Sequence, residues 1–343
     1  LLLWQLALHR DRASIDKVEG IAHPKTGPLV RRFLAQLPFS LTKAQQRVAA
    51  EIFHDMEQQI PMARLLQGDV GSGKTVVALL GLLKAIDNGY QGALMVPTEI
   101  LAEQHYLNIK EYVAALGINI ALATSSLARE KREEIKQRLL TGEIQLIVGT
   151  HALIQDDIEF ANLGLAVIDE QHRFGVSQRG KLLAKGRNKP DLLVMTATPI
   201  PRTLALTFYG DLDFSVIDEL PPGRKPVVTR YVPEKNRQQA YDFIKEHLQR
   251  GKQAYIVCPL VDESDKIQAE AAVTLFENLS KGAFRDYRLG LVYGKMPAQH
   301  KEQVMKEFRR GELDLLVATT VIEVGVDVPN ATVILITGCE RFG

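Results

Sequence analysis

Short apolar runs alternate with helical stretches along most of the chain. In the first half, the runs that can form buried strands are residues 64–67, 93–96, 146–148, 165–168 and 192–195. Strand–helix alternation of this kind predicts a parallel sheet with helices on both faces.

Residues 42–60 carry an apolar stripe with helical spacing. The stripe consists of Ala44, Val48, Ile52 and Met56. A repeat of four residues predicts an amphipathic helix, with Thr42 as its N-cap. From this stripe alone, Gln45 would be an exposed polar residue. A second, shorter amphipathic helix is expected over residues 29–37.

The stretch Pro221-Pro222-Gly223-Arg224-Lys225-Pro226 interrupts both helix and strand, so it predicts a boundary between two lobes. Beyond it the alternation restarts. The expected strands are 227–231, 254–258, 288–292, 313–317 and 332–336, and the expected helices are 238–249, 265–279 and 297–310. We therefore expect a helical connector (residues 1–38), a first α/β lobe (39–222) and a second (223–343).

Composition limits the class of protein. The 343 residues suffice for two domains, and 46% hydrophobic with 24% charged residues is typical of a globular protein. The formal net charge is +1, so a nucleic-acid site would need a local basic surface. Cys258 and Cys339 stand far apart, which argues against a disulfide framework or a zinc module and favours the cytoplasm. The apolar residues 1–8 are too few to span a bilayer.

The chemistry centres on Gly68-Asp69-Val70-Gly71-Ser72-Gly73-Lys74-Thr75, which has the pattern G-x-x-x-x-G-K-T. It lies between an expected strand and the apolar run 76–86, which is the context that a phosphate-binding loop requires. Glycines allow backbone N–H groups to converge on phosphate oxygens, and the following helix adds its positive end. Lys74 is expected to reach the β- and γ-phosphates of ATP, and Thr75 to bind Mg²⁺. The flanking pattern favours this interpretation over a chance match.

Two carboxylates end the expected strand 165–168. Asp169 is expected to hold Mg²⁺, and Glu170 to orient and deprotonate the attacking water. Gln171 and His172 follow, and this polar pair could sense the γ-phosphate. A lone histidine is more often structural, but the Asp-Glu-Gln-His tetrad favours the sensor role for His172. The run Met195-Thr196-Ala197-Thr198-Pro199 could hydrogen-bond to these residues, or it could be a strand-end turn.

These motifs resemble those of superfamily 2 helicases. Four runs are similar to the RecG family of branched-DNA helicases: residues 167–179 (V-I-D-E-Q-H-R-F-G-V-S-Q-R), 196–203 (T-A-T-P-I-P-R-T), 218–224 (D-E-L-P-P-G-R) and 37–42 (L-P-F-S-L-T). The resemblance implies two tandem RecA-like lobes, the second incomplete. It also implies ATP-dependent remodelling of stalled forks and Holliday junctions in bacterial recombination and repair. Branched duplex DNA and single-strand-binding protein would be partners of a cytoplasmic, nucleoid-associated monomer.

The resemblance also implies roles for individual residues. Gln45 matches a glutamine that recognises adenine, and Gly325 and Asp327 would face the nucleotide. The residues matching DNA-backbone contacts are Pro97, Thr98, Thr150, His151, Thr319 and Thr320, with Gln104 and His105 in the same segment as Thr98. Ordinary strand-end capping is the alternative for Thr98 and Thr150. For Arg202 two roles are equally expected: coupling between nucleotide state and movement, or a surface ion pair.

The chain also departs from the family pattern. A wedge domain upstream, an arginine-finger motif and a C-terminal hairpin would lie outside these residues, so we expect nucleotide binding with impaired hydrolysis. Residues 123–126 and 336–339 differ from the family sequence. Three alternatives remain: a transcription-repair coupling translocase, whose tetrad usually reads D-E-E-H, an RNA helicase, and a nucleotide-gated DNA clamp without turnover.

Overall fold

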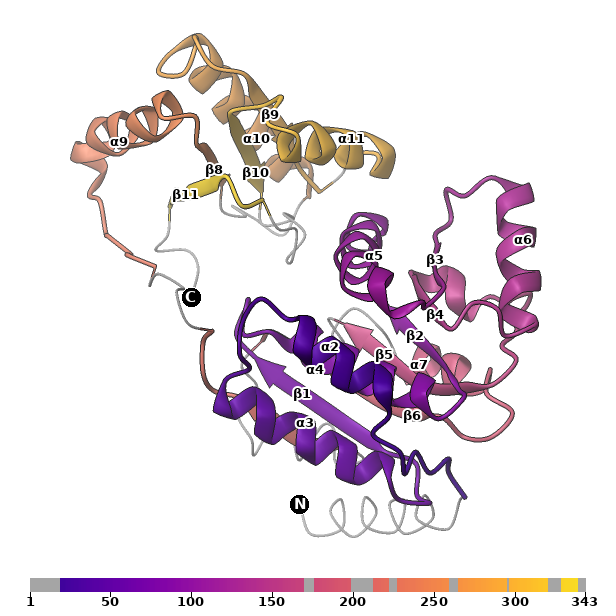
Figure 1. Cartoon of the computed structure of the whole chain (residues 1–343). Coiled ribbons are helices and arrows are strands. Elements are labelled where there is room, and N and C mark those ends of the chain that lie inside the picture. The colour runs from indigo at the N-terminus through magenta and orange to yellow at the C-terminus, as the bar shows by residue number, and fades with distance from the viewer. Residues whose placement is uncertain are drawn as a thin grey trace, which may run out of the picture. The chain divides into compact units, whose positions relative to one another are not determined.

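The computed structural model describes residues 19–169, 176–198, 212–221, 227–258, 265–294, 296–319 and 328–338. The chain divides into two compact units, residues 1–225 and 226–343, and the division falls within the proline-rich stretch 221–226. Both units are α/β (Figure 1). None of the described helices combines the length and apolar content that a membrane span requires.

Unit 1 is built on a seven-stranded sheet in which every described pairing is parallel, in the order β3-β4-β2-β5-β6-β1-β7. The strands are β1 (Ala63–Gly68), β2 (Gln91–Met95), β3 (Ile120–Ala123), β4 (Leu146–Gly149), β5 (Leu163–Asp169), β6 (Asp191–Thr196) and β7 (Asp213–Ile217). The predicted parallel sheet is confirmed. The sequence interpretation missed β3 and β7, which form the two edges.

Helices cover both faces of this sheet. One face carries α2 (Pro28–Gln36), α3 (Lys43–Met56), α4 (Lys74–Asp87) and α5 (Glu99–Val113), and the other carries α6 (Arg129–Leu140) and α7 (Val176–Leu183). Short 3₁₀ turns span Ala114–Leu116 and His151–Ile154. Successive strand residues point to opposite faces. Accordingly, Leu66 belongs to the core under α2–α5 and Leu65 to the core under α6 and α7.

Helix α3 is shorter than the sequence predicts, because it ends at Met56 and not at residue 60. Its predicted N-cap is confirmed. The Thr42 hydroxyl accepts a hydrogen bond from the Gln45 backbone N–H (3.2 Å), and the Gln45 side-chain oxygen accepts one from the Thr42 N–H (2.9 Å). This reciprocal capping box satisfies two N–H groups that a helix start would otherwise leave unpaired.

The segment before α2 is fastened to unit 1 by buried polar contacts. The His23 backbone N–H donates to the Met56 carbonyl (2.7 Å). The His23 and Asp191 side chains are both fully buried, with Nε2 and Oδ2 3.4 Å apart. Asp191 also accepts the Met62 N–H (2.7 Å), and burial raises the pKa of its carboxyl above the ordinary value. At the start of α2, the Asp87 carboxylate accepts the N–H groups of residues 29 and 30 (3.0 and 3.2 Å).

Unit 2 contains a four-stranded parallel sheet in the order β11-β8-β10-β9. Its strands are β8 (Gln253–Cys258), β9 (Leu289–Val292), β10 (Leu315–Thr319) and β11 (Ala331–Ile336), and its helices are α9 (Arg237–Gln249), α10 (Asp265–Lys281) and α11 (Ala298–Arg309), with a 3₁₀ turn over Glu234–Asn236. The predicted strand 227–231 is wrong. Val227 is 82% exposed, and this segment pairs with no described strand. A segment rich in β-forming residues becomes a strand only where a neighbour completes the hydrogen-bond ladder.

The buried His23–Asp191 contact generates a test. Asp191→Ala should lower the free energy of unfolding of unit 1 by about 3 kcal/mol, because the Met62 N–H would lose its acceptor and the buried His23 ring would lose its neighbouring carboxylate. Urea unfolding followed by circular dichroism measures this. The exposed Asp156→Ala is the matched control and should change stability by less than about 0.5 kcal/mol. Equal midpoints for both variants would contradict the assignment.

Candidate nucleotide and nucleic-acid site

The glycine-rich loop joins β1 to α4 at the carboxyl edge of the sheet, where open α/β folds bind ligands. Gly71 (φ +75°) and Gly73 (φ +87°) adopt the left-handed backbone conformation that favours glycine. Gly73 is the N-cap of α4, and no described side chain caps that helix start. The loop therefore presents a helix N-terminus, which attracts anions.

Gln45 lies directly against this loop. Its side-chain Nε2 donates to the Ser72 carbonyl at 2.7 Å, and the residue is 2% exposed. The expectation of an exposed Gln45 from the helical stripe is wrong, because the first turn of α3 faces the loop as well as the core. A Cβ added at Gly73 would lie 2.3 Å from this Nε2, so Gln45 leaves no room for a larger residue there.

The loop also holds polar groups suited to an anion. The Lys74 ammonium donates to the carbonyls of Gly68 (2.7 Å) and Asp69 (3.1 Å), which places its positive charge over the loop. The Ser72 hydroxyl is buried and has no hydrogen-bond partner among the described residues. Thr75 is half-buried in the first turn of α4. These groups fit a phosphate, whose oxygens accept from ammonium, hydroxyl and backbone N–H groups.

Asp169 ends β5 at the same edge of the sheet, as the sequence predicts. The His105 Nε2 of α5 lies 3.1 Å from the Asp169 Oδ2. Sequence analysis grouped His105 with a DNA-contacting segment and did not anticipate this pairing. Glu170, Gln171 and His172 lie outside the described residues. Among the described residues no three His, Cys, Asp or Glu side chains form a metal cluster. Mg²⁺ bound with ATP needs no such cluster, because one or two carboxylates and the phosphates serve as ligands.

The threonines at the strand ends divide into two kinds. Thr98 caps α5, since its hydroxyl accepts the Leu101 N–H (3.3 Å), and this supports the capping alternative. Similarly, the Thr196 hydroxyl accepts the Thr198 N–H (3.2 Å), as in a strand-end turn. In contrast, the hydroxyls of Thr150 after β4 and Thr319 at the end of β10 are buried without a hydrogen-bond partner among the described residues.

The remaining predicted contacts are only partly described. Pro97 directly precedes the Thr98 cap. The His151 ring nitrogen Nε2 lies 3.3 Å from the Ser125 hydroxyl, so the stretch that departs from the family pattern adjoins a predicted DNA-contacting residue. Other predicted residues lie outside the described part of the chain: Arg202, Thr320, Gly325 and Asp327.

Comparison with known proteins gives two family matches. The DEAD/DEAH box helicase family matches residues 42–207, and the helicase conserved C-terminal domain matches residues 237–341. The ATP-dependent DNA helicase RecG of Thermotoga maritima is 51% identical over 343 residues, which is 100% of this chain and 44% of the relative. The RecG of Bacillus subtilis is 50% identical over 343 residues, or 50% of its length. The chain belongs to the RecG family.

Solved structures agree with this assignment. A RecG bound to a three-way DNA junction superposes with a TM-score of 0.83 at 47% identity, covering 97% of this chain and 43% of that one. The RNA-bound Mss116p, at 16% identity and a TM-score of 0.65, shows the shared fold alone. The chain spans about half the length of the RecG relatives it matches.

The contact between Gln45 and Gly73 generates a matched pair of substitutions. Gly73→Ala should weaken binding of a fluorescent ATP analogue by about ten-fold or more, because the new methyl group displaces Gln45 and distorts the loop. Gly89→Ala introduces the same left-handed strain (φ +84°) with no atom within 4 Å of its Cβ. Backbone strain should cost each variant about 1 kcal/mol of stability, and Gly73→Ala should lose more because it also displaces Gln45. Equal ATP affinities, measured by fluorescence titration, would contradict the assigned contact.

Proposed function

We propose that this chain forms the motor of a helicase that uses ATP to move on duplex DNA. Its substrates would be stalled forks and Holliday junctions in bacterial recombination and repair, and it would act as a monomer in the cytoplasm and nucleoid. The observation that carries this proposal is the 47% identity, across 97% of the chain, to a RecG whose structure contains a three-way DNA junction.

The nucleotide would bind at the glycine-rich loop. Its phosphates would be contacted by Gly68, Asp69, Gly71, Ser72, Gly73 and Lys74. Two left-handed glycines, the unpartnered Ser72 hydroxyl and the Lys74 ammonium support this placement. Thr75 and Asp169 would hold Mg²⁺, which would supply charge neutralisation at the phosphates. Glu170 would act as the base, Gln171 and His172 as the γ-phosphate sensor, and Gly325 and Asp327 as further nucleotide contacts.

Gln45 would contact adenine in this proposal, so its side-chain amide must be able to form a further hydrogen bond. Both ends of the Gln45 amide already have protein partners, since the oxygen accepts the Thr42 N–H and the nitrogen donates to Ser72. An amide oxygen has two lone pairs and an NH₂ group has two hydrogens. A further hydrogen bond to adenine is therefore compatible with the cap and the loop contact remaining in place.

The DNA backbone would be contacted by Pro97, Thr98, Thr150, His151, Thr319 and Thr320. A phosphate oxygen would give the buried hydroxyls of Thr150 and Thr319 the hydrogen-bond partner that the described residues do not provide. Phosphate contacts position a strand without reading its sequence. They suit an enzyme that passes over any sequence, and they fit a chain whose net charge is close to zero.

The proposal is tested with the full-length protein and branched DNA. Glu170→Gln should abolish DNA-stimulated ATP turnover while ATP still binds, because the substitution removes the proposed base but leaves the loop intact. Lys74→Ala should weaken both binding and turnover. Turnover by Glu170→Gln would show that the base is misassigned. ATP binding without turnover in the wild type would favour a nucleotide-gated DNA clamp, and stimulation by RNA in place of DNA would favour an RNA helicase.

The His105–Asp169 contact predicts a connection between DNA and ATP hydrolysis. Helix α5 begins at the proposed DNA contact Thr98 and carries His105 to the proposed metal ligand. His105→Ala should therefore reduce the DNA-stimulated rate of ATP hydrolysis by about ten-fold and the DNA-free rate much less. Asn108→Ala, an exposed position on the same helix, should change neither rate. Equal losses in both rates would contradict a role in DNA stimulation.

A further inference from the structure

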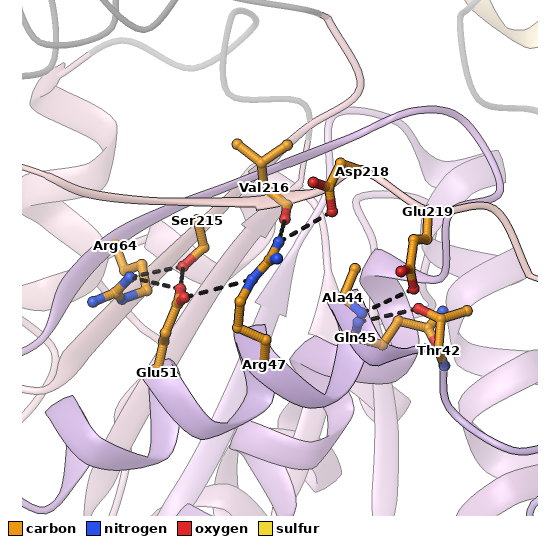
Figure 2. A network of polar contacts seen from close by, with 10 residues as sticks. All are labelled: Thr42, Ala44, Gln45, Arg47, Glu51, Arg64, Ser215, Val216, Asp218 and Glu219. Atoms are coloured by element: carbon orange, nitrogen blue, oxygen red, sulfur yellow. Dashed lines mark hydrogen bonds and ion pairs between the residues drawn. The ribbon is translucent and has the colours of Figure 1, made fainter.

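The segment by which the chain leaves unit 1 is attached to the start of α3. Strand β7 ends at Ile217, and Asp218 and Glu219 follow it on the way to the division at residue 225. The Glu219 Oε2 accepts the backbone N–H of Ala44 at 3.0 Å (Figure 2). Ala44 lies in the first turn of α3, where unpaired N–H groups and the helix dipole favour a carboxylate.

A second attachment lies one turn further along α3. The Arg47 Nη2 donates to the Val216 carbonyl (2.9 Å) and to the Asp218 Oδ1 (3.1 Å) (Figure 2). A hydrogen bond from its own backbone N–H, and then the one from Arg47, hold the pKa of Asp218 below its ordinary value. Both acidic residues of the exit segment therefore contact the same helix, through separate groups.

Charged and polar side chains hold the rest of α3 against the sheet. Arg64 of β1 donates to the Asp55 carboxylate (2.6 and 2.8 Å) and to the Ser215 hydroxyl of β7 (2.7 Å). Glu51 accepts from the same Ser215 hydroxyl (Figure 2). Arg64 is 9% exposed, whereas the side chains of Asp55 and Glu51 are 22% and 37% exposed, so these contacts are partly shielded from solvent. The helix is therefore fixed to β1 and β7, and its first turn is held from outside by Glu219.

The same first turn contacts the phosphate-binding loop. Gln45, the residue after Ala44, donates to the Ser72 carbonyl at 2.7 Å and fills the space beside Gly73. Two consecutive residues of α3 thus join the exit segment to the loop. Strand β7, which leads into the exit segment, also contacts the loop directly, because its last residue, Ile217, pairs with Gly68, the first residue of the loop.

We propose that Glu219 is a positioning residue of the nucleotide site. Through Ala44 and Gln45 it fixes the phosphate-binding loop relative to the exit segment, residues 218–221. The inference rests on the proposed function, because it requires the loop to bind ATP. Energetic coupling between two sites is reciprocal, so nucleotide in the loop also stabilises the attachment of the exit segment.

The first experiment uses the full-length protein and a fluorescent ATP analogue. Glu219→Ala removes the acceptor of the Ala44 N–H and should raise the Kd of the nucleotide about five-fold. The turnover number should change less than the KM, because Glu219 positions the loop and does not touch the reacting atoms. Glu219→Gln keeps an oxygen acceptor and should stay within about two-fold of the wild type. Glu143→Ala is the matched control, since this glutamate of unit 1 is exposed like Glu219 and its printed partner is Arg138 rather than α3.

A second experiment measures amide hydrogen exchange in the wild type and in Glu219→Ala. In the wild type, the nucleotide analogue should slow amide hydrogen exchange in residues 212–221, and this response should disappear in Glu219→Ala. A merely structural role would lower the unfolding temperature without altering either readout. The inference would be overturned if a folded Glu219→Ala bound the nucleotide with wild-type affinity. It would also be overturned if the nucleotide did not change hydrogen exchange in residues 212–221 of the wild type. Failure of the wild type to bind ATP would instead overturn the proposed function.

Discussion

The hydrogen bond from the Gln45 side chain to the Ser72 carbonyl is the contact on which the nucleotide site depends. It is buried, so losing it would leave a donor and an acceptor unpaired away from water, at a cost of about 1–3 kcal/mol. It also dictates the sequence of the loop, because Gln45 fills the space that a side chain at position 73 would need. The glycine there satisfies two demands together, a left-handed backbone and close contact with α3.

Polar contacts hold both end segments of unit 1 against its helices and sheet, the segment before α2 and the segment after β7. On the entry side, His23 is buried beside Asp191, and Asp87 caps α2. On the exit side, the Glu219 carboxylate accepts the Ala44 N–H in the first turn of α3. Helices α3 and α4 pack against the same core, and both have the loop at their first turn. A displacement of the exit segment would therefore move α3 and, with it, the glycine-rich loop. The contacts of the entry segment lie away from the loop.

Local patterns in the sequence predicted what local physics decides. The central strands and the glycine loop were identified because buried strands are apolar and G-x-x-x-x-G-K-T requires this backbone. The edge strands β3 and β7 were missed, since half-exposed residues carry a weaker pattern. Residues 227–231 contain the β-formers Val227, Val228 and Tyr231 but have no described strand to pair with. The contacts of Gln45 with Ser72 and of His105 with Asp169 join residues 27 and 64 positions apart, which no periodicity reveals.

A buried hydroxyl lies at the carboxyl end of a parallel strand in each unit. Thr150 follows β4 in unit 1 and Thr319 ends β10 in unit 2, and neither hydroxyl has a hydrogen-bond partner among the described residues. A buried hydroxyl without a partner is destabilising, so a fold tolerates it where a ligand supplies the bond. Each lies at the carboxyl edge of a parallel sheet, where open α/β folds bind ligands. In the proposed function, phosphate oxygens of the DNA backbone would supply the missing bond to the hydroxyl of each unit.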